Sequence, residues 1–182
     1  HDSVNFLNLG SGPRIIEDKF WVNADFYRFR KAPDFNFWGL DLRYPMKCPD
    51  AVWDGVFTEH TLEHLYPREV RNLLKELHRT MKTGAFIRII VPNLAPYLEF
   101  SSRSREESRM GQFNSQCEAI RTLTQDYYHH SLWNADLFLS ELTRAGFVEA
   151  RETSFGEGEM VELVRDQDVR RWESLYIEAR KG

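Results

Sequence analysis

One stretch near the start of the chain restricts the possible folds more than any other. Residues 4–12, VNFLNLGSG, form a short apolar run that ends in Gly10 and Gly12. Such a run suits a buried strand better than an amphipathic helix, and the glycines allow a sharp turn and the close approach of a ligand. A strand that leads into a glycine loop predicts a doubly wound α/β sheet with a nucleotide-like ligand at its strand ends.

The composition predicts a single globular domain over residues 1–182, large enough to bury a core without disulfides or metals. The net charge of −4 argues against broad nucleic-acid binding. Cys48 and Cys117 lie far apart without metal-ligand spacing, which favours reduced thiols and a cytoplasmic location. No apolar run reaches the roughly 18 residues of a membrane span, and no signal peptide is expected before the first strand.

The first half of the chain predicts closely spaced strands, at residues 20–26, 35–42 and 53–58. A parallel crossover normally takes about a dozen residues including its helix. The connections 10–19, 27–34 and 43–52 barely reach that length, so we expect reduced helices between the first four strands. Aromatic residues crowd positions 20–38 and are expected to cover the sheet surface that missing helices leave open. Burial of this surface in a homodimer is the alternative, and sedimentation would test it.

The second half reads as helices and strands separated by one polar insertion. An apolar stripe predicts a helix over 67–82, with Pro67 in its first turn and Gly84 ending it. Residues 134–145 predict another helix, capped by Gly146. Residues 94–130, polar and weakly periodic, are expected to form an insertion on the substrate side. Further strands are expected at residues 86–91, 147–155 and 174–180.

Acidic residues stand at the ends of successive predicted strands. Asp25 ends the second strand, Asp41 and Leu42 the third, and Glu59 and His60 the fourth. The carboxyl ends of parallel strands form the ligand crevice of an open sheet. A carboxylate at the second strand end can accept both hydroxyls of a ribose. An aspartate beside an apolar residue at the third can bind an adenine ring.

These segments together resemble the class I S-adenosylmethionine-dependent methyltransferases, and most closely their compact methyltransferase-11-like group. The matching segments run in family order along nearly the whole chain: LNLGSG (7–12), WVNAD (21–25), DLRYP (41–45), TEHTLEH (58–64), ELHRTMKTG (76–84), RIIVP (88–92), LTRAGF (142–147) and LYIEARK (175–181). The resemblance implies a Rossmann-like sheet of seven strands, mostly parallel, whose antiparallel last strand lies beside the fifth. It also implies that the cofactor S-adenosylmethionine is bound by Asn8, Leu9, Gly10, Ser11, Gly12, Asp25, Asp41, Leu42, Glu59 and His60.

Two departures from the general nucleotide-binding pattern help to choose between cofactors. The third glycine of the loop is absent, since Ile15 and Ile16 follow Arg14, and the first helix is nearly gone. S-adenosylmethionine carries no phosphate, so both departures weaken a nicotinamide-dependent oxidoreductase more than a methyltransferase. A non-catalytic methyltransferase-like binding domain stays open as a further alternative.

The resemblance implies methyl transfer, and O-methylation assisted by a histidine base is the expected chemistry. Histidine suits this role because its pKa lies near neutrality. The candidates are His60, His129 and His130. Tyr97, Tyr128 and Trp133 could stack on a small hydroxylated metabolite or a saccharide, the acceptors that the family context favours. The residue spacing shows no metal site.

Overall fold

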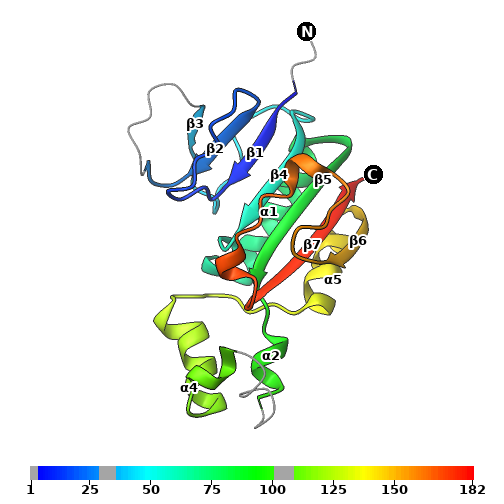
Figure 1. The fold of residues 1–182 in the computed structure, drawn as a ribbon. Helices are drawn as coiled ribbons and strands as arrows, with labels where there is room; N and C mark the ends of the chain where they lie inside the picture. Colours follow the sequence, from blue (N-terminus) through cyan, green and yellow to red (C-terminus); the bar gives the residue numbers. More distant parts are fainter. Residues whose placement is uncertain (1–3, 29–35, 101–108) are drawn as a thin grey trace.

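The computed structural model describes residues 4–28, 36–100 and 109–182 of the chain. Its centre is a seven-stranded sheet in the order β3-β2-β1-β4-β5-β7-β6 (Figure 1). The strands are β1 (Phe6–Leu9), β2 (Trp21–Asp25), β3 (Phe37–Gly39), β4 (Trp53–Glu59), β5 (Met81–Pro92), β6 (Phe147–Thr153) and β7 (Ser174–Lys181). The first five strands pair in parallel, and β7 runs antiparallel to both β5 and β6. The expected seven-stranded architecture is therefore confirmed.

The β3–β2–β1 end of the sheet is built with very short connections. No helix forms in the segment 10–20 between β1 and β2, or in the described segment 40–52 between β3 and β4. Strand β3 spans only three residues, much less than the predicted strand over 35–42, and Phe35 lies outside the described residues. Leu40 is buried in the core instead of continuing the strand.

The predicted end of the long helix was wrong by two residues. Helix α1 (Pro67–Thr80) ends at Thr80, because Met81 already has an extended backbone with φ −80° and ψ 148° and opens β5. Gly84, expected to end the helix, lies inside that strand with φ +86°. Both Thr80 and Met81 are fully buried, so packing on both sides of this boundary allows an abrupt change from helix to strand without an intervening loop.

Helices cover one face of the sheet. Helix α1 and helix α5 (Ala135–Ala145) pack side by side behind the strands in Figure 1. Their apolar residues share one core cluster with Leu7, Val56 and Ile89 of the sheet. Left-handed Gly146 ends α5 as the sequence predicted, whereas Asn134, expected to be the first helical residue, caps the start of the helix through its side chain.

A segment without an α-helix, residues 154–173, covers part of the opposite face. We call it the C-terminal link; it contains the short turns η4 (Val161–Leu163) and η5 (Asp168–Arg170). Leu163 of the link is fully buried in a second apolar cluster with Phe6, Trp21 and Tyr176. Trp21 and Phe6 stack with ring centroids 5.1 Å apart. Aromatic residues and the link therefore provide the cover that a doubly wound fold normally receives from helices.

The fully buried Arg88 of β5 holds the C-terminal link in place. Its guanidinium binds both carboxylate oxygens of Asp166 at 2.7 and 2.6 Å and an oxygen of Glu178 at 3.2 Å. It also donates to the backbone carbonyls of Ser154 and Glu157. A buried charge needs such complete pairing, and here the pairing fixes the start of the link and Asp166 in its middle.

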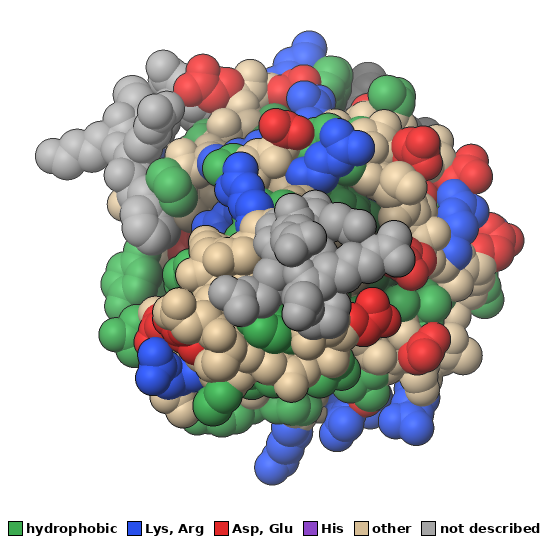
Figure 2. All heavy atoms as spheres, turned by 60° about the horizontal axis from the view of Figure 1, so that its bottom comes forward, with side chains coloured by type: hydrophobic (Ala, Val, Ile, Leu, Met, Phe, Trp, Pro, Cys, Tyr) green, Lys and Arg blue, Asp and Glu red, His purple; other side chains and the backbone are tan. Residues whose placement is uncertain are grey.

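The insertion forms a small lobe at the carboxyl edge of the sheet (Figure 1). It contains α2 (Ala95–Leu98), η2 (Arg109–Gln112), α4 (Gln116–Arg121) and the single π-turn η3 (Thr122–Asp126), whereas residues 101–108 lie outside the described part. The lobe has its own apolar cluster: Tyr97, Met110, Phe113, Ala119 and Leu123. Figure 2 shows acidic, basic and hydrophobic side chains interspersed over the described part of this side of the molecule. Within the described residues, no helix has the length and apolar character to cross a membrane.

Candidate cofactor and active site

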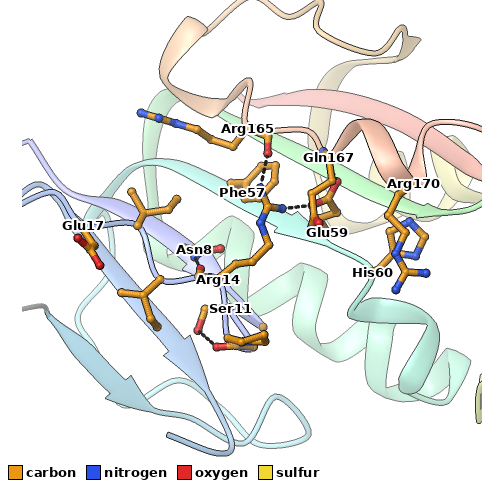
Figure 3. A pocket seen from close by; sticks show the side chains of 15 residues that line it. Asn8, Ser11, Arg14, Glu17, Phe57, Glu59, His60, Arg165, Gln167 and Arg170 are labelled. Atoms are coloured by element: carbon orange, nitrogen blue, oxygen red, sulfur yellow. Dashed lines mark hydrogen bonds and ion pairs between the residues drawn. The ribbon is translucent and has the colours of Figure 1, made fainter. Parts of the chain in front are cut away.

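The carboxyl ends of β1, β2 and β4 surround two hollows that meet at the glycine loop. One is a cleft of about 620 Å³ between this loop, Glu59 and the C-terminal link, shown in Figure 3. The other, of about 500 Å³, is lined by Asp25, Asp41 and Leu42. Gly10, Gly12 and His60 line both hollows. The structure therefore brings the residues from separate predicted strand ends to one place.

The glycine loop needs glycine for two different reasons. Gly10 has φ +68°, and a Cβ built there would lie 2.2 Å from the side chain of Thr61. Gly12 has φ +51°, but a Cβ there would meet no described atom within 4 Å. The first glycine thus permits close packing of β1 against the turn after β4, whereas the second keeps the surface of both hollows open.

Asp25 closes the loop onto β2. Its Oδ2 accepts a hydrogen bond of 2.8 Å from the backbone N–H of Gly12, and its Oδ1 accepts one of 3.0 Å from that of Tyr27. A carboxylate held by two N–H groups is fixed in orientation. The side chain lies in the wall of the second hollow, where its remaining acceptor capacity can meet a diol.

Asp41 lies further along the same wall and is paired with Arg43. The guanidinium donates to both carboxylate oxygens, at 2.9 and 2.6 Å, and these bonds lower the pKa of Asp41 below its ordinary value. Asp41 is thus an ionised acceptor, and Leu42 beside it offers an apolar surface. This pair has the chemistry that an adenine ring requires.

A network of asparagines replaces the missing first helix. Buried Asn8 donates through Nδ2 to Asn23 Oδ1 and to the carbonyl of Arg14, both at 2.9 Å. Asn23 in turn bonds both the N–H and the carbonyl of Ile16. These bonds fix the 13–19 segment as an ordered loop, so Asn8 both lines the cleft and supports its wall.

Sequence reasoning missed the basic residues of the cleft. Arg14 reaches from the glycine loop to Glu59 and also donates to the carbonyl of Arg165 at 3.1 Å (Figure 3). Glu59 accepts a further bond of 2.9 Å from the backbone N–H of Gln167. Arg165 and Arg170 of the C-terminal link complete the lining. The position of Arg14 directly after the loop was a usable signal, whereas no local pattern places the link at this cleft.

His60 lies between the two hollows with a left-handed backbone, φ +49°. Its Nε2 lies 2.8 Å from Ser174 Oγ, and its Nδ1 lies 3.3 Å from Oε1 of Glu63. Of the three candidate histidines, it is the one that lines either hollow. His60 is thus placed at the expected site, with both ring nitrogens facing protein groups.

His129 and His130 follow each other in sequence but face different surroundings. The His129 side chain is 7% exposed, and burial lowers its pKa while the Glu63 carboxylate opposes that shift. His130 is exposed and stacks on Tyr66 with ring centroids 4.5 Å apart. Glu63, His64 and His129 offer ligand atoms within 4.8 Å of one another. The residue spacing gave no sign of this cluster, because its members come from segments far apart in the chain.

The three aromatic candidates for substrate binding are dispersed. Tyr97 is 1% exposed and belongs to the apolar cluster of the insertion. Trp133 is 2% exposed, with its indole N–H bound to Ser131 Oγ and its ring against Phe138. Tyr128 is 77% exposed. In this conformation none of the three lines either hollow.

Comparison with solved structures identifies the fold. The chain is similar to a SAM-dependent methyltransferase from Archaeoglobus fulgidus, with 19% identity over 99% of this chain and 87% of that one, and a TM-score of 0.61. It is also similar to an S-adenosylmethionine-dependent methyltransferase from Mesorhizobium loti, with 13% identity over 98% and 91% of the two chains and a TM-score of 0.62. Human N-acetylserotonin methyltransferase in complex with SAM matches 97% of this chain with 47% of its own, at 16% identity and a TM-score of 0.58. No family model matches the sequence. The chain thus has the class I S-adenosylmethionine-dependent methyltransferase fold.

Proposed function

We propose that this chain is an enzyme that transfers the methyl group of S-adenosylmethionine. The supporting observation is that the glycine loop, Asp25 and Asp41 lie around one hollow at the carboxyl edge of a sheet with the methyltransferase fold. This edge is where open α/β sheets bind their ligands. The similar proteins from Archaeoglobus fulgidus and Mesorhizobium loti are themselves S-adenosylmethionine-dependent methyltransferases.

Each part of the cofactor meets a matching group in this arrangement. Asp25 accepts the ribose hydroxyls, and Asp41 with Leu42 receives the adenine ring. Gly10 and Gly12 let the cofactor lie close to the main chain of the loop. The methionine part then extends into the cleft, where Arg14, Arg165 and Arg170 provide cations for its carboxylate.

The same geometry disfavours a dinucleotide. Dinucleotide folds bind their pyrophosphate at the N-terminus of the helix that follows the first strand. Here the 13–19 segment has no helix and its backbone is bound by Asn8 and Asn23. A sulfonium cofactor without phosphate needs no helix terminus, so the missing helix counts against the nicotinamide alternative alone.

We further propose that the acceptor is a small hydroxylated metabolite or a saccharide and that the reaction is O-methylation. Alignment of the acceptor oxygen with the activated methyl group supplies much of the rate, and a base adds roughly 10²–10⁴-fold. Position favours His60 as the assisting histidine over His129 and His130, because His60 borders both hollows. Tyr97 and Trp133 lie in packed apolar clusters, which disfavours them as residues that stack on the acceptor.

Calorimetric titration with S-adenosylmethionine, S-adenosylhomocysteine and NAD tests the core of the proposal. We expect the first two to bind and NAD not to bind. Asp25→Asn should lower the affinity for S-adenosylmethionine and S-adenosylhomocysteine by about tenfold or more, since a hydrogen bond to a charged group contributes about 1.5–3 kcal/mol. Asparagine keeps an oxygen for the Gly12 N–H, so the loop is retained. Asp136→Asn, on the exposed start of α5, is the matched control.

If neither S-adenosylmethionine nor S-adenosylhomocysteine binds, the proposal is refuted. Binding without turnover of any acceptor would favour a non-catalytic methyltransferase-like domain. Turnover is read from the release of S-adenosylhomocysteine across a panel of hydroxylated metabolites and saccharides.

We also propose that the protein is cytoplasmic and forms a homodimer. Phe20, Phe26 and Tyr27 are 41%, 57% and 65% exposed and offer a surface for a second copy. Sedimentation of a monomer at high concentration would exclude that dimer.

A further inference from the structure

A buried carboxylate, Glu63, lies at the centre of three imidazole rings. Its side chain is 2% exposed, and neither carboxylate oxygen accepts a hydrogen bond from any described residue. Oε1 lies 3.3 Å from His60 Nδ1, 3.9 Å from His64 Nε2 and 3.9 Å from His129 Nε2. A buried carboxylate without a partner is costly, so this arrangement requires a physical explanation.

The proton on His60 is assigned by its other neighbour. The Ser174 hydroxyl has one proton and donates it to the carbonyl of Arg170 at 2.7 Å. Ser174 Oγ therefore accepts from His60 Nε2, which lies 2.8 Å away and must carry the proton. In a neutral His60, the bare Nδ1 then directs its lone pair toward the Glu63 carboxylate.

The same reasoning applies to His64. Its Nδ1 lies 3.4 Å from the carbonyl of Tyr128, which can only accept a hydrogen bond. The proton therefore belongs on Nδ1, and Nε2 presents a lone pair toward Glu63. A backbone carbonyl that fixes the outer nitrogen is the usual support of a metal-binding histidine.

His129 reaches the cluster because its segment is fastened to the turn that carries Glu63. The carbonyl of Glu63 accepts from the backbone N–H of His130 at 2.7 Å and of Ser131 at 3.1 Å. The hydroxyl of Ser131 also donates to the carbonyl of Leu62. These bonds hold two distant parts of the chain together independently of the His129 ring.

We propose that Glu63, His64 and His129 form a binding site for a divalent transition-metal ion of the zinc class. A cation at this position would satisfy the acceptor atoms that converge there. One carboxylate and two imidazoles form a ligand set that suits zinc and related ions, with a further position for water.

The distances describe a site that closes slightly around the ion. Ligands of a tetrahedral zinc site lie roughly 3.3 Å apart, as follows from bonds of about 2.0–2.1 Å. The separations from Glu63 Oε1 to His64 Nε2 and His129 Nε2 are both 3.9 Å, so both must shorten slightly around the ion. His64 is 49% exposed, which leaves an entry path for the ion. His60 and His64 also line the hollow that contains Asp25, which places the site beside the proposed cofactor pocket.

Titration of the full chain with Co²⁺, a zinc substitute with visible absorption, tests the proposal directly. We expect one equivalent to bind with the ligand-field bands of a four-coordinate nitrogen and oxygen site, and Zn²⁺ to displace it. Glu63→Gln and His64→Asn should each weaken binding by at least about tenfold, because even supporting residues of metal sites have effects of 10–100-fold. His130→Asn, adjacent in sequence but stacked on Tyr66, should leave binding unchanged.

His64→Asn keeps the test valid even if Glu63→Gln disturbs the buried turn, since His64 is half exposed. Lack of Co²⁺ binding to the wild-type chain, or equal binding by the His64→Asn and His130→Asn variants, would overturn the proposal. In that case an ion pair between Glu63 and a protonated His60 is the remaining explanation. Because the readout is metal absorption, it does not depend on whether the chain binds S-adenosylmethionine.

Discussion

The two glycines of the opening loop look equivalent in sequence but have different roles. A Cβ at Gly10 would collide with Thr61, whereas a Cβ at Gly12 would point into open space at the proposed cofactor surface. Spacing alone could not separate these roles, because the collision involves a residue on the turn after β4. The distinction matters for any test of the site.

We expect Gly10→Ala and Gly12→Ala to have separable effects. Gly10→Ala should lower the free energy of unfolding by several kcal/mol, since it combines the roughly 1–2 kcal/mol of left-handed strain with a clash against the Thr61 side chain. Gly12→Ala should cost only the strain, about 1–2 kcal/mol, yet weaken S-adenosylmethionine binding. Urea unfolding and calorimetry of both variants check this. Equal loss of stability in the two variants would contradict the assigned roles.

A test of His60 requires a replacement that can adopt its left-handed backbone conformation. Because its φ is +49°, asparagine is a better replacement than alanine, since Asn tolerates the left-handed region. We expect His60→Asn to lower methyl transfer by roughly 10²–10⁴-fold while S-adenosylmethionine still binds. His130→Asn, exposed and outside both hollows, is the control. Unchanged turnover in His60→Asn would exclude this histidine from the reaction.

At the level of elements, the sequence predicted correctly those helix ends that neighbouring residues determine. The C-cap of α5, Gly146, lies where the sequence placed it, because capping depends on neighbouring residues. The end of α1 was misplaced, since burial of Thr80 and Met81 in the core decided it instead of Gly84. The C-terminal link had no readable pattern, because Arg88 positions it through contacts with residues far along the chain.

The link should depend on Arg88 more than on any exposed ion pair near it. Arg88→Met leaves Asp166 buried without its cation and removes one of the two cations of Glu178, and removal of one partner from such a buried cluster costs about 3–5 kcal/mol. Arg151→Met is the matched control, because Arg151 also pairs with Glu178 but is 42% exposed. Its loss should cost no more than about 1 kcal/mol.

Urea unfolding of the two arginine variants checks this difference. Since the link carries Arg165 and Arg170 to the cleft, Arg88→Met should also weaken S-adenosylmethionine binding in calorimetry. Similar stability of the two variants would show that the buried cluster does not hold the link.

At the scale of the whole molecule, the sequence predicted the sheet and the meeting of its strand-end residues at one edge. Strand-end residues such as Asp25 and Asp41 could be placed because parallel strands bring their carboxyl ends to one edge. The cover of the second face, the basic cleft and the Glu63 cluster could not be placed. Each depends on contacts between distant segments, as between Arg14 and Arg165 or Glu63 and His129, and such contacts leave no periodic signal in one sequence.

Ligand binding at the glycine loop should stabilise the folded state of the entire chain. A ligand that binds only the folded state at about 100 times its dissociation constant adds about 2.7 kcal/mol. For a chain of this size, each kcal/mol raises the melting temperature by roughly 2–4 °C, so we expect S-adenosylmethionine or S-adenosylhomocysteine to raise it by about 5–10 °C. NAD should give no shift, because the glycine loop lacks the helix terminus that a pyrophosphate needs. The shift should fall to about half or less in Asp25→Asn, because a tenfold weaker ligand at the same concentration adds only about 1.4 kcal/mol. It should persist in Asp136→Asn, and an equal shift with NAD would instead support the dinucleotide alternative. Thermal unfolding by calorimetry, with each ligand in the same large excess, measures all of these outcomes in one protein preparation.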